Sequence, residues 1–284
     1  MPTFPASDGT RLSYRVEGRG APLVCLPGGP MLPSSYLRDL GGLTAQRSLV
    51  LLDLRGTGDS EEPSDTGSYR VDRQVDDVEA LRAALGLERL DVLAHSAAGD
   101  LALLYAARYP ERISALVLVT SRARAVGIDF TPEHRREALE LRSREPWYPE
   151  AVVAFDAVVE GTATDEQWEL FSRLGFGRWD EAAAAFDAEN EELGNDEAAD
   201  AYPAPEAFAD AAAVREVLAK LDAPVLVLSG ELDGGPRPVV AAEVAAVFPR
   251  GEHVVQPATG HYPWIDDPAF FARTVAEFLD RHGR

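Results

Sequence analysis

The chain has 284 residues and a formal net charge of −21. This length fits one α/β core with a modest insertion, and a folded chain of this size buries about three quarters of the surface that the unfolded chain exposes. The negative charge argues against nucleic acid and anionic membrane surfaces as partners, because both attract positive charge. The single cysteine, Cys25, lies in an apolar run, the N-terminus lacks a signal-peptide pattern and no apolar run could span a bilayer, so we expect a cytoplasmic protein.

Apolar runs in the first part of the chain alternate with helical patterns. A turn at Asp8-Gly9-Thr10 precedes residues 12–16, whose alternation is typical of an edge strand. Core strands are expected at 22–26, 48–53, 90–95 and 113–119, with helices at 71–85 and 100–108 among those between them. This alternation predicts a mostly parallel central sheet covered by helices on both faces.

A serine stands where the strand at 90–95 meets the following helix. A sharp strand-to-helix turn displays a nucleophile, and it tolerates only small neighbours, which Ala94 and Ala98 provide around Ser96. A helix N-cap serine is the alternative interpretation of this stretch alone. If Ser96 is a nucleophile, the N–H of Ala97 would form one half of an oxyanion hole. The N–H of Gly29, or next that of Gly28, would form the other half.

Residues 122–205 depart from the alternating pattern, since they contain helical runs rich in Ala, Glu and aromatic residues. They predict a helical cap inserted into a core of residues 1–121 and 206–284. Residues 125–205 include 20 acidic and 6 basic side chains, a net of −14. The cap is therefore the acidic part of the chain and could attract a cation.

An acid and a base are needed to activate the serine. The apolar run at 224–230 ends before two carboxylates, of which we favour Asp233 over Glu231 because of its spacing from Gly230. Of the five histidines, His261 lies on a loop between the strand at 254–255 and a helix near residue 268, where it can reach over a cleft. His95 adjoins the serine and diverges from it, so His261 is the predicted base.

These motifs resemble the α/β-hydrolases, which use the same chain order of serine, acid and histidine. Among them the chain is most similar to the proline iminopeptidase branch. Gly28-Gly29-Pro30 matches the core of that branch's His-Gly-Gly-Pro-Gly loop. Asp53-Leu54-Arg55-Gly56-Thr57-Gly58-Asp59-Ser60 matches its Asp-x-Arg-Gly-x-Gly-x-Ser turn. The likeness covers about residues 10–121 and 206–282.

The chain also departs from that branch. Pro27 replaces its histidine, Met31 replaces its final glycine, and alanines replace the glycines that flank the serine. The resemblance implies that a cap glutamate binds the substrate's ammonium group, and Glu189 in a Glu-Asn segment is the best match. A solvated surface carboxylate is the competing interpretation of Glu189.

Together the residues predict two-step acyl transfer by a Ser96–Asp233–His261 triad on a small-molecule or short-peptide substrate. The first hypothesis is an aminopeptidase that releases N-terminal proline or another small residue. The second is an esterase, lactonase or other small-molecule hydrolase, and the third is a non-catalytic ligand-binding protein. The mechanism requires no metal or organic cofactor, and no Cys and His cluster has ligand spacing. The sequence leaves the oligomeric state open.

Overall fold

The computed structural model describes residues 1–190 and 193–282, so residues 191–192 of the predicted cap and residues 283–284 lie outside it. A central sheet of eight strands has the order β1-β2-β4-β3-β5-β6-β7-β8. β1 and β2 pair antiparallel to their neighbours, and the other strands are parallel. The strands are β1 Thr3–Pro5, β2 Arg11–Gly18, β3 Pro22–Leu26, β4 Ser48–Leu52, β5 Leu90–His95, β6 Ile113–Val119, β7 Val225–Gly230 and β8 Gly251–Gln256.

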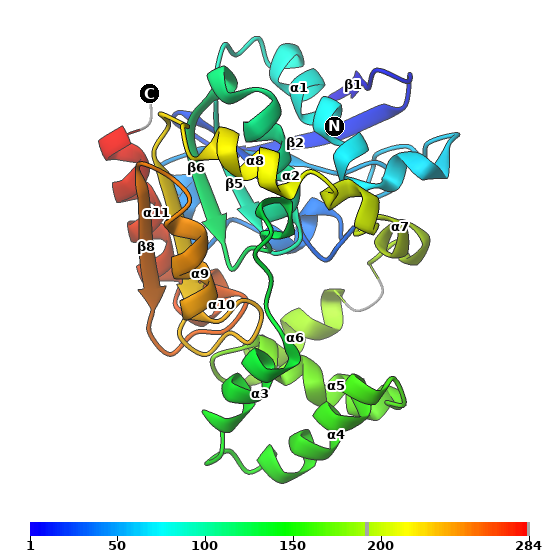
Figure 1. Ribbon diagram of the computed structural model, residues 1–284, viewed down its shortest axis with the longest axis vertical. Coiled ribbons are helices and arrows are strands. Elements are labelled where there is room, and N and C mark those ends of the chain that lie inside the picture. The colour runs from blue at the N-terminus through cyan, green and yellow to red at the C-terminus, as the bar shows by residue number, and fades with distance from the viewer. Residues whose placement is uncertain (191–192, 283–284) are drawn as a thin grey trace.

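Helices cover both faces of this sheet (Figure 1). The apolar side chains of α1, α2, α8 and α9 belong to the cluster on one face, while α11 packs on the other. Every residue of β5 and β7 is buried, as expected for strands enclosed on both sides. The predicted α/β-hydrolase architecture is therefore confirmed. The helices around the sheet are α1 Val75–Ala84, α2 Ala98–Arg108, α8 Ala211–Leu218, α9 Pro238–Ala245, α10 Pro263–Asp266 and α11 Pro268–His282.

Two local expectations differ from the structure. Residues 12–16 lie in β2, but the edge position belongs to the three-residue β1, which pairs with β2 from Thr3 to Pro5. The helix expected at 71–85 begins as α1 only at Val75, because residues 71–73 form a 3-10 turn. The side chain of Gln74, just before α1, donates a hydrogen bond to the carbonyl of Tyr69 and holds that turn.

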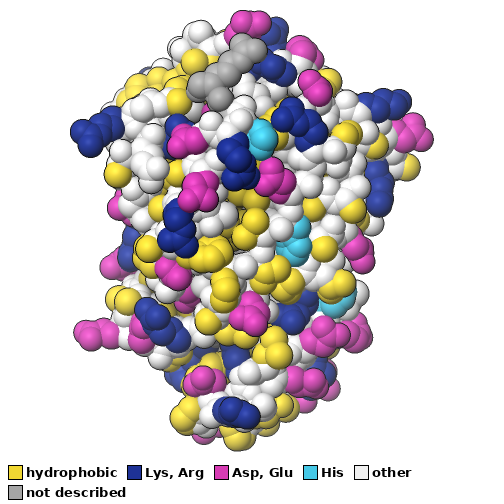
Figure 2. All heavy atoms as spheres, turned by 90° about the vertical axis from the view of Figure 1, so that its left-hand side faces the viewer, with side chains coloured by type: hydrophobic (Ala, Val, Ile, Leu, Met, Phe, Trp, Pro, Cys, Tyr) yellow, Lys and Arg dark blue, Asp and Glu magenta, His cyan; other side chains and the backbone are white. Residues whose placement is uncertain are grey.

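The opposite edge of the sheet is β8, which presents charged side chains. Glu252 on this strand pairs with Arg281 of α11 over 2.7 Å. Figure 2 views the molecule from this side and shows acidic and basic side chains interspersed between apolar ones. Such charges hinder the pairing of an edge strand with another chain.

The segment predicted as a cap is helical. Its helices are α3 Pro132–Glu140, α4 Tyr148–Glu160, α5 Asp165–Ser172, α6 Glu181–Asn190 and α7 Asp196–Ala201. Helices α3 to α6 lie together beyond one end of the sheet, whereas α7 lies beside the core (Figure 1). Leu139, Ala151 and Phe155 form a small apolar cluster of their own in this segment. We retain 122–205 as the proposed extent of the cap.

Within the residues that the structure describes, no helix is both long enough and apolar enough to cross a membrane.

Candidate active site

Ser96 lies at the turn between β5 and α2. Its backbone φ is +53°, a left-handed conformation that a serine adopts only when the surrounding chain enforces it. Ala94 and Ala98 on either side are fully buried, so the surrounding atoms leave little room for larger side chains at these two positions. A close approach follows at Gly99, where a Cβ would lie 2.4 Å from the carbonyl oxygen of Arg122. The turn is thus held against the loop after β6.

His261 lies in the loop between β8 and α10, and three other segments fix its backbone. Its N–H donates to the carbonyl of Gly175 over 2.7 Å. Its carbonyl accepts from Thr120 Oγ1 and from His95 Nε2, each at 2.9 Å. The imidazole is therefore positioned by its own main chain before any side-chain contact is counted.

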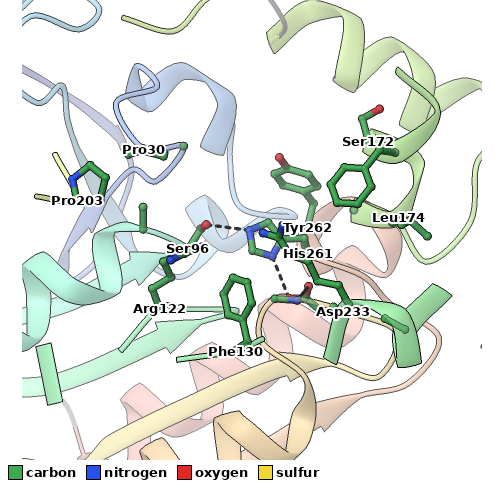
Figure 3. A pocket seen from close by; sticks show the side chains of 18 of the residues that line it. Pro30, Ser96, Arg122, Phe130, Ser172, Leu174, Pro203, Asp233, His261 and Tyr262 are labelled. Carbon is green, nitrogen blue, oxygen red and sulfur yellow. Dashed lines mark hydrogen bonds and ion pairs between the residues drawn. The ribbon is translucent and has the colours of Figure 1, made fainter. Parts of the chain in front are cut away.

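The side chains of Ser96, His261 and Asp233 form one hydrogen-bonded series (Figure 3). Asp233 Oδ2 lies 2.9 Å from His261 Nδ1, and His261 Nε2 lies 2.9 Å from Ser96 Oγ. Because an ionised carboxylate only accepts, Nδ1 carries the proton, and Nε2 of the neutral ring accepts from the serine hydroxyl. This is the tautomer that a general base requires.

Asp233, rather than Glu231, is the carboxylate that reaches the histidine. Asp233 is 2% exposed and its second oxygen, Oδ1, accepts from the N–H of Gly235 over 2.8 Å. Glu231 is exposed and accepts from the N–H of Ala258. The fold of the turn after β7 therefore directs Asp233 toward His261 and Glu231 toward Ala258, although the two carboxylates are close in sequence.

The loop after β3 lies directly over the serine turn. A Cβ on Gly28 would lie 2.6 Å from the carbonyl oxygen of His95 and 2.8 Å from Ser96 Cβ, so only glycine fits there. Gly29 has a φ of +118° and, like Ala97, lines the cavity beside Ser96. In the described part of the chain, neither Gly29 nor Ala97 donates its N–H to a protein acceptor. Both remain available to a ligand.

Gly28 has a different place from the one that the sequence suggests. Its N–H donates to the hydroxyl of Tyr36 over 2.7 Å, and it does not line the cavity. As a correction, Gly28 is a packing residue beneath the site and its N–H is already engaged. The close approach to Ser96 that makes it glycine also keeps it away from a substrate.

His95 has a role that the sequence reasoning missed. Its Nδ1 lies 2.6 Å from the hydroxyl of Tyr36, and its Nε2 donates to the carbonyl of His261. Burial lowers the pKa of His95 well below its ordinary value, and the neighbouring His261 lowers it further. A neutral His95 fits this pattern, with Nε2 as donor and Nδ1 as acceptor. The available signal in the sequence is a histidine directly before Ser96, at the end of an apolar run.

A cavity of about 580 Å³ opens in front of Ser96 and His261. Figure 3 shows Ser172 of α5 and Phe130 of the segment after β6 on opposite sides of the His261 ring. Tyr202 also lines the cavity, and its hydroxyl lies 3.4 Å from the carbonyl oxygen of Ala97. The walls thus come from both the core and the cap segment.

Glu189 does not reach this cavity. It is 63% exposed and forms an ion pair with Arg38 on the outside of the cap segment. Asp187, two residues earlier on α6, lines the cavity instead and accepts from Ser172 Oγ over 2.6 Å. Burial raises the pKa of the Asp187 carboxyl, and the nearby Glu169 adds to this rise. The correction follows from helix geometry, because two residues turn the side chain by about 200°.

The cavity is less acidic than the cap composition suggests. Three arginines line it, Arg122, Arg124 and Arg135, against two acidic residues, Asp187 and Asp233. Most of the acidic side chains of the cap segment therefore lie outside the cavity lining.

The Arg55 turn, which contributed to the family resemblance, has a structural place. Arg55 is buried and pairs with Asp77, over 2.6 Å and 2.8 Å, and with Asp8 over 2.8 Å. It does not line the cavity. Across the described residues, no three His, Cys, Asp or Glu side chains are grouped in a way that could hold a metal ion.

Comparison with known proteins gives a consistent picture. A family model described as the alpha/beta hydrolase fold matches residues 21–268. The chain is 22% identical to proline iminopeptidase from Heyndrickxia coagulans, over 96% of each chain. It is 34% identical to cis-3-alkyl-4-alkyloxetan-2-one decarboxylase from Shewanella oneidensis over 122 residues, which are 42% of this chain and only 38% of that protein.

Among solved structures, proline iminopeptidase from Mycobacterium smegmatis is similar over almost the whole chain. It has a TM-score of 0.77 and 25% identity, covering 99% of this chain and 98% of that one. These similarities confirm the resemblance that the loop at Gly28-Gly29-Pro30 and the turn around Arg55 predict.

Proposed function

The chain belongs to the α/β-hydrolase fold family, and we propose that it is a serine hydrolase acting by two-step acyl transfer. The observation that carries the proposal is the series Ser96 Oγ, His261 imidazole and Asp233 carboxylate, with 2.9 Å at each link, on the wall of the cavity. A nucleophile, a base and an orienting acid in mutual reach are the requirements for this chemistry.

In the proposed reaction, Ser96 Oγ attacks the substrate carbonyl carbon while His261 Nε2 takes the hydroxyl proton. Asp233 holds the ring and stabilises the imidazolium that forms. The tetrahedral intermediate then collapses, the bond to the leaving group breaks, and His261 returns the proton to that group. Water, activated by His261 in the same way, hydrolyses the acyl-enzyme and restores Ser96.

The oxyanion of each tetrahedral intermediate would be bound by the N–H groups of Ala97 and Gly29. Both residues line the cavity beside Ser96, and neither N–H has a protein acceptor in the described part of the chain. Donors that are already fixed in place stabilise charge without reorganisation during the reaction.

As the specific activity we propose an aminopeptidase that acts on short peptides. The similarity of this chain to proline iminopeptidases along almost its whole length supports this activity. An aminopeptidase must hold an ammonium group, and Asp187 replaces Glu189 as the proposed ligand because, of the cap carboxylates that the structure describes, it is the one that lines the cavity. Asp187 is half-buried in the cavity lining and has no cationic partner among the described residues, so its carboxylate can pair with a substrate ammonium group.

An esterase or lactonase with the same three residues is the second candidate. The observation that favours it is the presence of Arg122, Arg124 and Arg135 in the cavity lining, since cationic walls do not suit an ammonium group. In both cases the proposed partner is a small-molecule or short-peptide substrate, rather than nucleic acid or a membrane.

The test compares proline p-nitroanilide, its N-acetylated form and p-nitrophenyl acetate, with wild type and Ser96→Ala. Ser96-dependent cleavage of the free-amine anilide that acetylation abolishes supports the aminopeptidase. Ester cleavage without anilide turnover supports the second candidate. Equal rates for wild type and Ser96→Ala on every substrate would contradict a serine hydrolase and favour a ligand-binding protein.

A matched pair of variants tests the ammonium site. Asp187→Asn should raise KM for the anilide at least tenfold and leave KM for p-nitrophenyl acetate unchanged, because only the anilide carries the cation. Glu189→Gln, on the exposed side of the same helix, should change neither. An unchanged KM for the anilide in Asp187→Asn would exclude Asp187 as the ligand.

A further inference from the structure

Arg135 of α3 lies beside the loop that carries the proposed catalytic acid. A Cβ on Gly234, the residue after Asp233, would lie 3.2 Å from Arg135 Cα and 3.4 Å from its Cγ. The base of the arginine side chain is therefore packed on this loop. Its position relative to Asp233 and His261 is set by backbone contact.

Two aromatic rings flank the guanidinium group of Arg135. Its Cζ lies 5.0 Å from the centroid of the Phe130 ring and 5.7 Å from that of Phe171. Phe130 is itself held against Gly235, where a Cβ would lie 2.8 Å from the ring. Such cation–π contacts fix a guanidinium group while leaving its N–H donors without conventional acceptors.

Arg135 differs from the other two arginines of the cavity in its charge balance. Arg122 lies 3.6 Å from a carboxylate oxygen of Asp129, and Arg124 lies 3.6 Å from one of Asp100. Arg135 has no ion pair and no side-chain hydrogen bond with any residue in the described ranges 1–190 and 193–282. It is the cation of this cavity whose charge the protein leaves uncompensated at short range.

A partly buried guanidinium group such as that of Arg135 is unfavourable unless a bound anion balances its charge. Burial lowers the pKa of Arg135, and the more distant carboxylates of Asp233 and Asp129 offset this only in part. A partly buried cation without a partner costs free energy that an anionic ligand would recover. Planar guanidinium groups bind carboxylates through two parallel N–H···O hydrogen bonds.

Space for a ligand exists on both sides of Arg135. It lines the 580 Å³ cavity with Ser96 and His261, and it also lines a neighbouring pocket of about 250 Å³. The second pocket shares Phe130 and Phe171 with the first and extends to Val158 of α4. Figure 3 shows Phe130 and Arg122 on one side of the Ser96–His261 pair, away from Ser172.

We propose that Arg135 binds a carboxylate of the substrate, so that the substrate is an ester or amide with a free carboxylate remote from its reacting carbonyl. The inference rests on the proposed function for the place of that carbonyl at Ser96. In a short peptide, the carboxylate is the free C-terminus. In another acyl substrate, it is a distal acid group of the acyl chain.

Binding to the Ser96→Ala protein, measured by calorimetry, tests the proposal without turnover. One ligand pair is prolyl-alanine and prolyl-alaninamide, and the other is monomethyl glutarate and dimethyl glutarate. In at least one pair, we expect the ligand with the free carboxylate to bind about tenfold more tightly than its neutral partner. Arg135→Gln in the same background should abolish this preference while the affinity for the neutral partner is unchanged, which also reports an intact site.

Arg136→Gln is the matched control, because Arg136 is the next residue of α3, is exposed and pairs with Asp156. It should keep the full preference. Preference in the peptide pair places the carboxylate on the peptide, and preference in the glutarate pair places it on an acyl chain; either result supports the proposal. Equal affinities within both pairs, or a preference that survives Arg135→Gln, would overturn it. Hydrolysis of p-nitrophenyl acetate by wild type tests the serine hydrolase separately.

Discussion

His95 Nε2 donates a hydrogen bond to the backbone carbonyl of His261 over 2.9 Å, so the residue before the proposed nucleophile holds the proposed base. The other ring nitrogen continues the connection, because Nδ1 accepts from the hydroxyl of Tyr36. That hydroxyl in turn accepts from the N–H of Gly28, next to the proposed oxyanion donor Gly29. One series of hydrogen bonds therefore connects the loop after β3, the turn at Ser96 and the loop that carries His261.

Tyr36→Phe should interrupt this connection. It leaves the N–H of Gly28 and Nδ1 of His95 without their partner, and we expect kcat to fall about tenfold, the equivalent of one hydrogen bond. Steady-state kinetics with p-nitrophenyl acetate measure the change. Tyr109→Phe removes a 2.9 Å hydrogen bond to Asp76 away from the site and should leave kcat unchanged. A Tyr36→Phe protein with reduced stability and normal kcat would mean that the series only supports folding.

Asp233→Asn should lower turnover by about four orders of magnitude and leave the fold intact, because the asparagine amide favours the wrong tautomer of His261. Glu231→Gln is the control, since Glu231 is close in sequence and bonds to Ala258 rather than to the histidine. Rates of p-nitrophenyl acetate hydrolysis distinguish the two. A large loss in Glu231→Gln with none in Asp233→Asn would reverse the assignment of the acid.

Arg142 ties the cap segment to the loop of the proposed acid. Its buried guanidinium donates to the carbonyls of Leu174 and Phe176 in the cap and to that of Leu232 beside Asp233, at 2.8–3.0 Å. Burial lowers the pKa of Arg142 to about 10. We expect Arg142→Met to lower the free energy of unfolding by about 3 kcal/mol, because buried carbonyls lose charged donors.

Urea unfolding and limited proteolysis of the cap measure this effect. Arg144→Met is the matched control, because Arg144 is an exposed neighbour and should be neutral within about 0.5 kcal/mol. Activity should fall along with stability in Arg142→Met, since Gly175, between the two cap carbonyls, accepts from the N–H of His261. Equal stability of the two variants would show that Arg142 is dispensable.

Asp91 of β5 gives a prediction about pH. Burial raises the pKa of its carboxyl to about 6, and Oδ1 has no hydrogen-bond partner. Its pKa is higher in the folded than in the unfolded state, so the folded chain binds the proton first as the pH falls. Between pH 7.5 and pH 5.0 this proton should stabilise wild type by about 1 kcal/mol relative to Asp91→Asn.

Urea unfolding of both proteins at the two pH values measures the difference, and the other titrating groups cancel between them. The gain belongs to wild type alone, because asparagine does not titrate. A difference in unfolding free energy that is constant from pH 7.5 to pH 5.0 would contradict a raised pKa at Asp91.

Features that depend only on neighbouring residues can be predicted from the amino-acid sequence. Apolar runs indicated the central strands of the sheet, because burial on both faces requires continuous hydrophobicity. The small residues Ala94 and Ala98 located the turn at Ser96, because the steric limit of that turn is local. The chain order of Ser96, Asp233 and His261 narrowed the candidate residues further, although only the fold places His261 2.9 Å from each of the other two side chains.

Tertiary structure decided which polar side chains face the cavity. Asp187 lines it and Glu189 does not, although both lie on α6, because the orientation of a docked helix selects one side. The pairing of Tyr36 with His95 spans 59 residues of sequence, and Arg135 meets Phe171 through the packing of two cap helices. Composition predicted an acidic cap but not an arginine-lined cavity, because net charge carries no information about direction. That direction follows from helix packing, which depends on contacts between residues far apart in the chain.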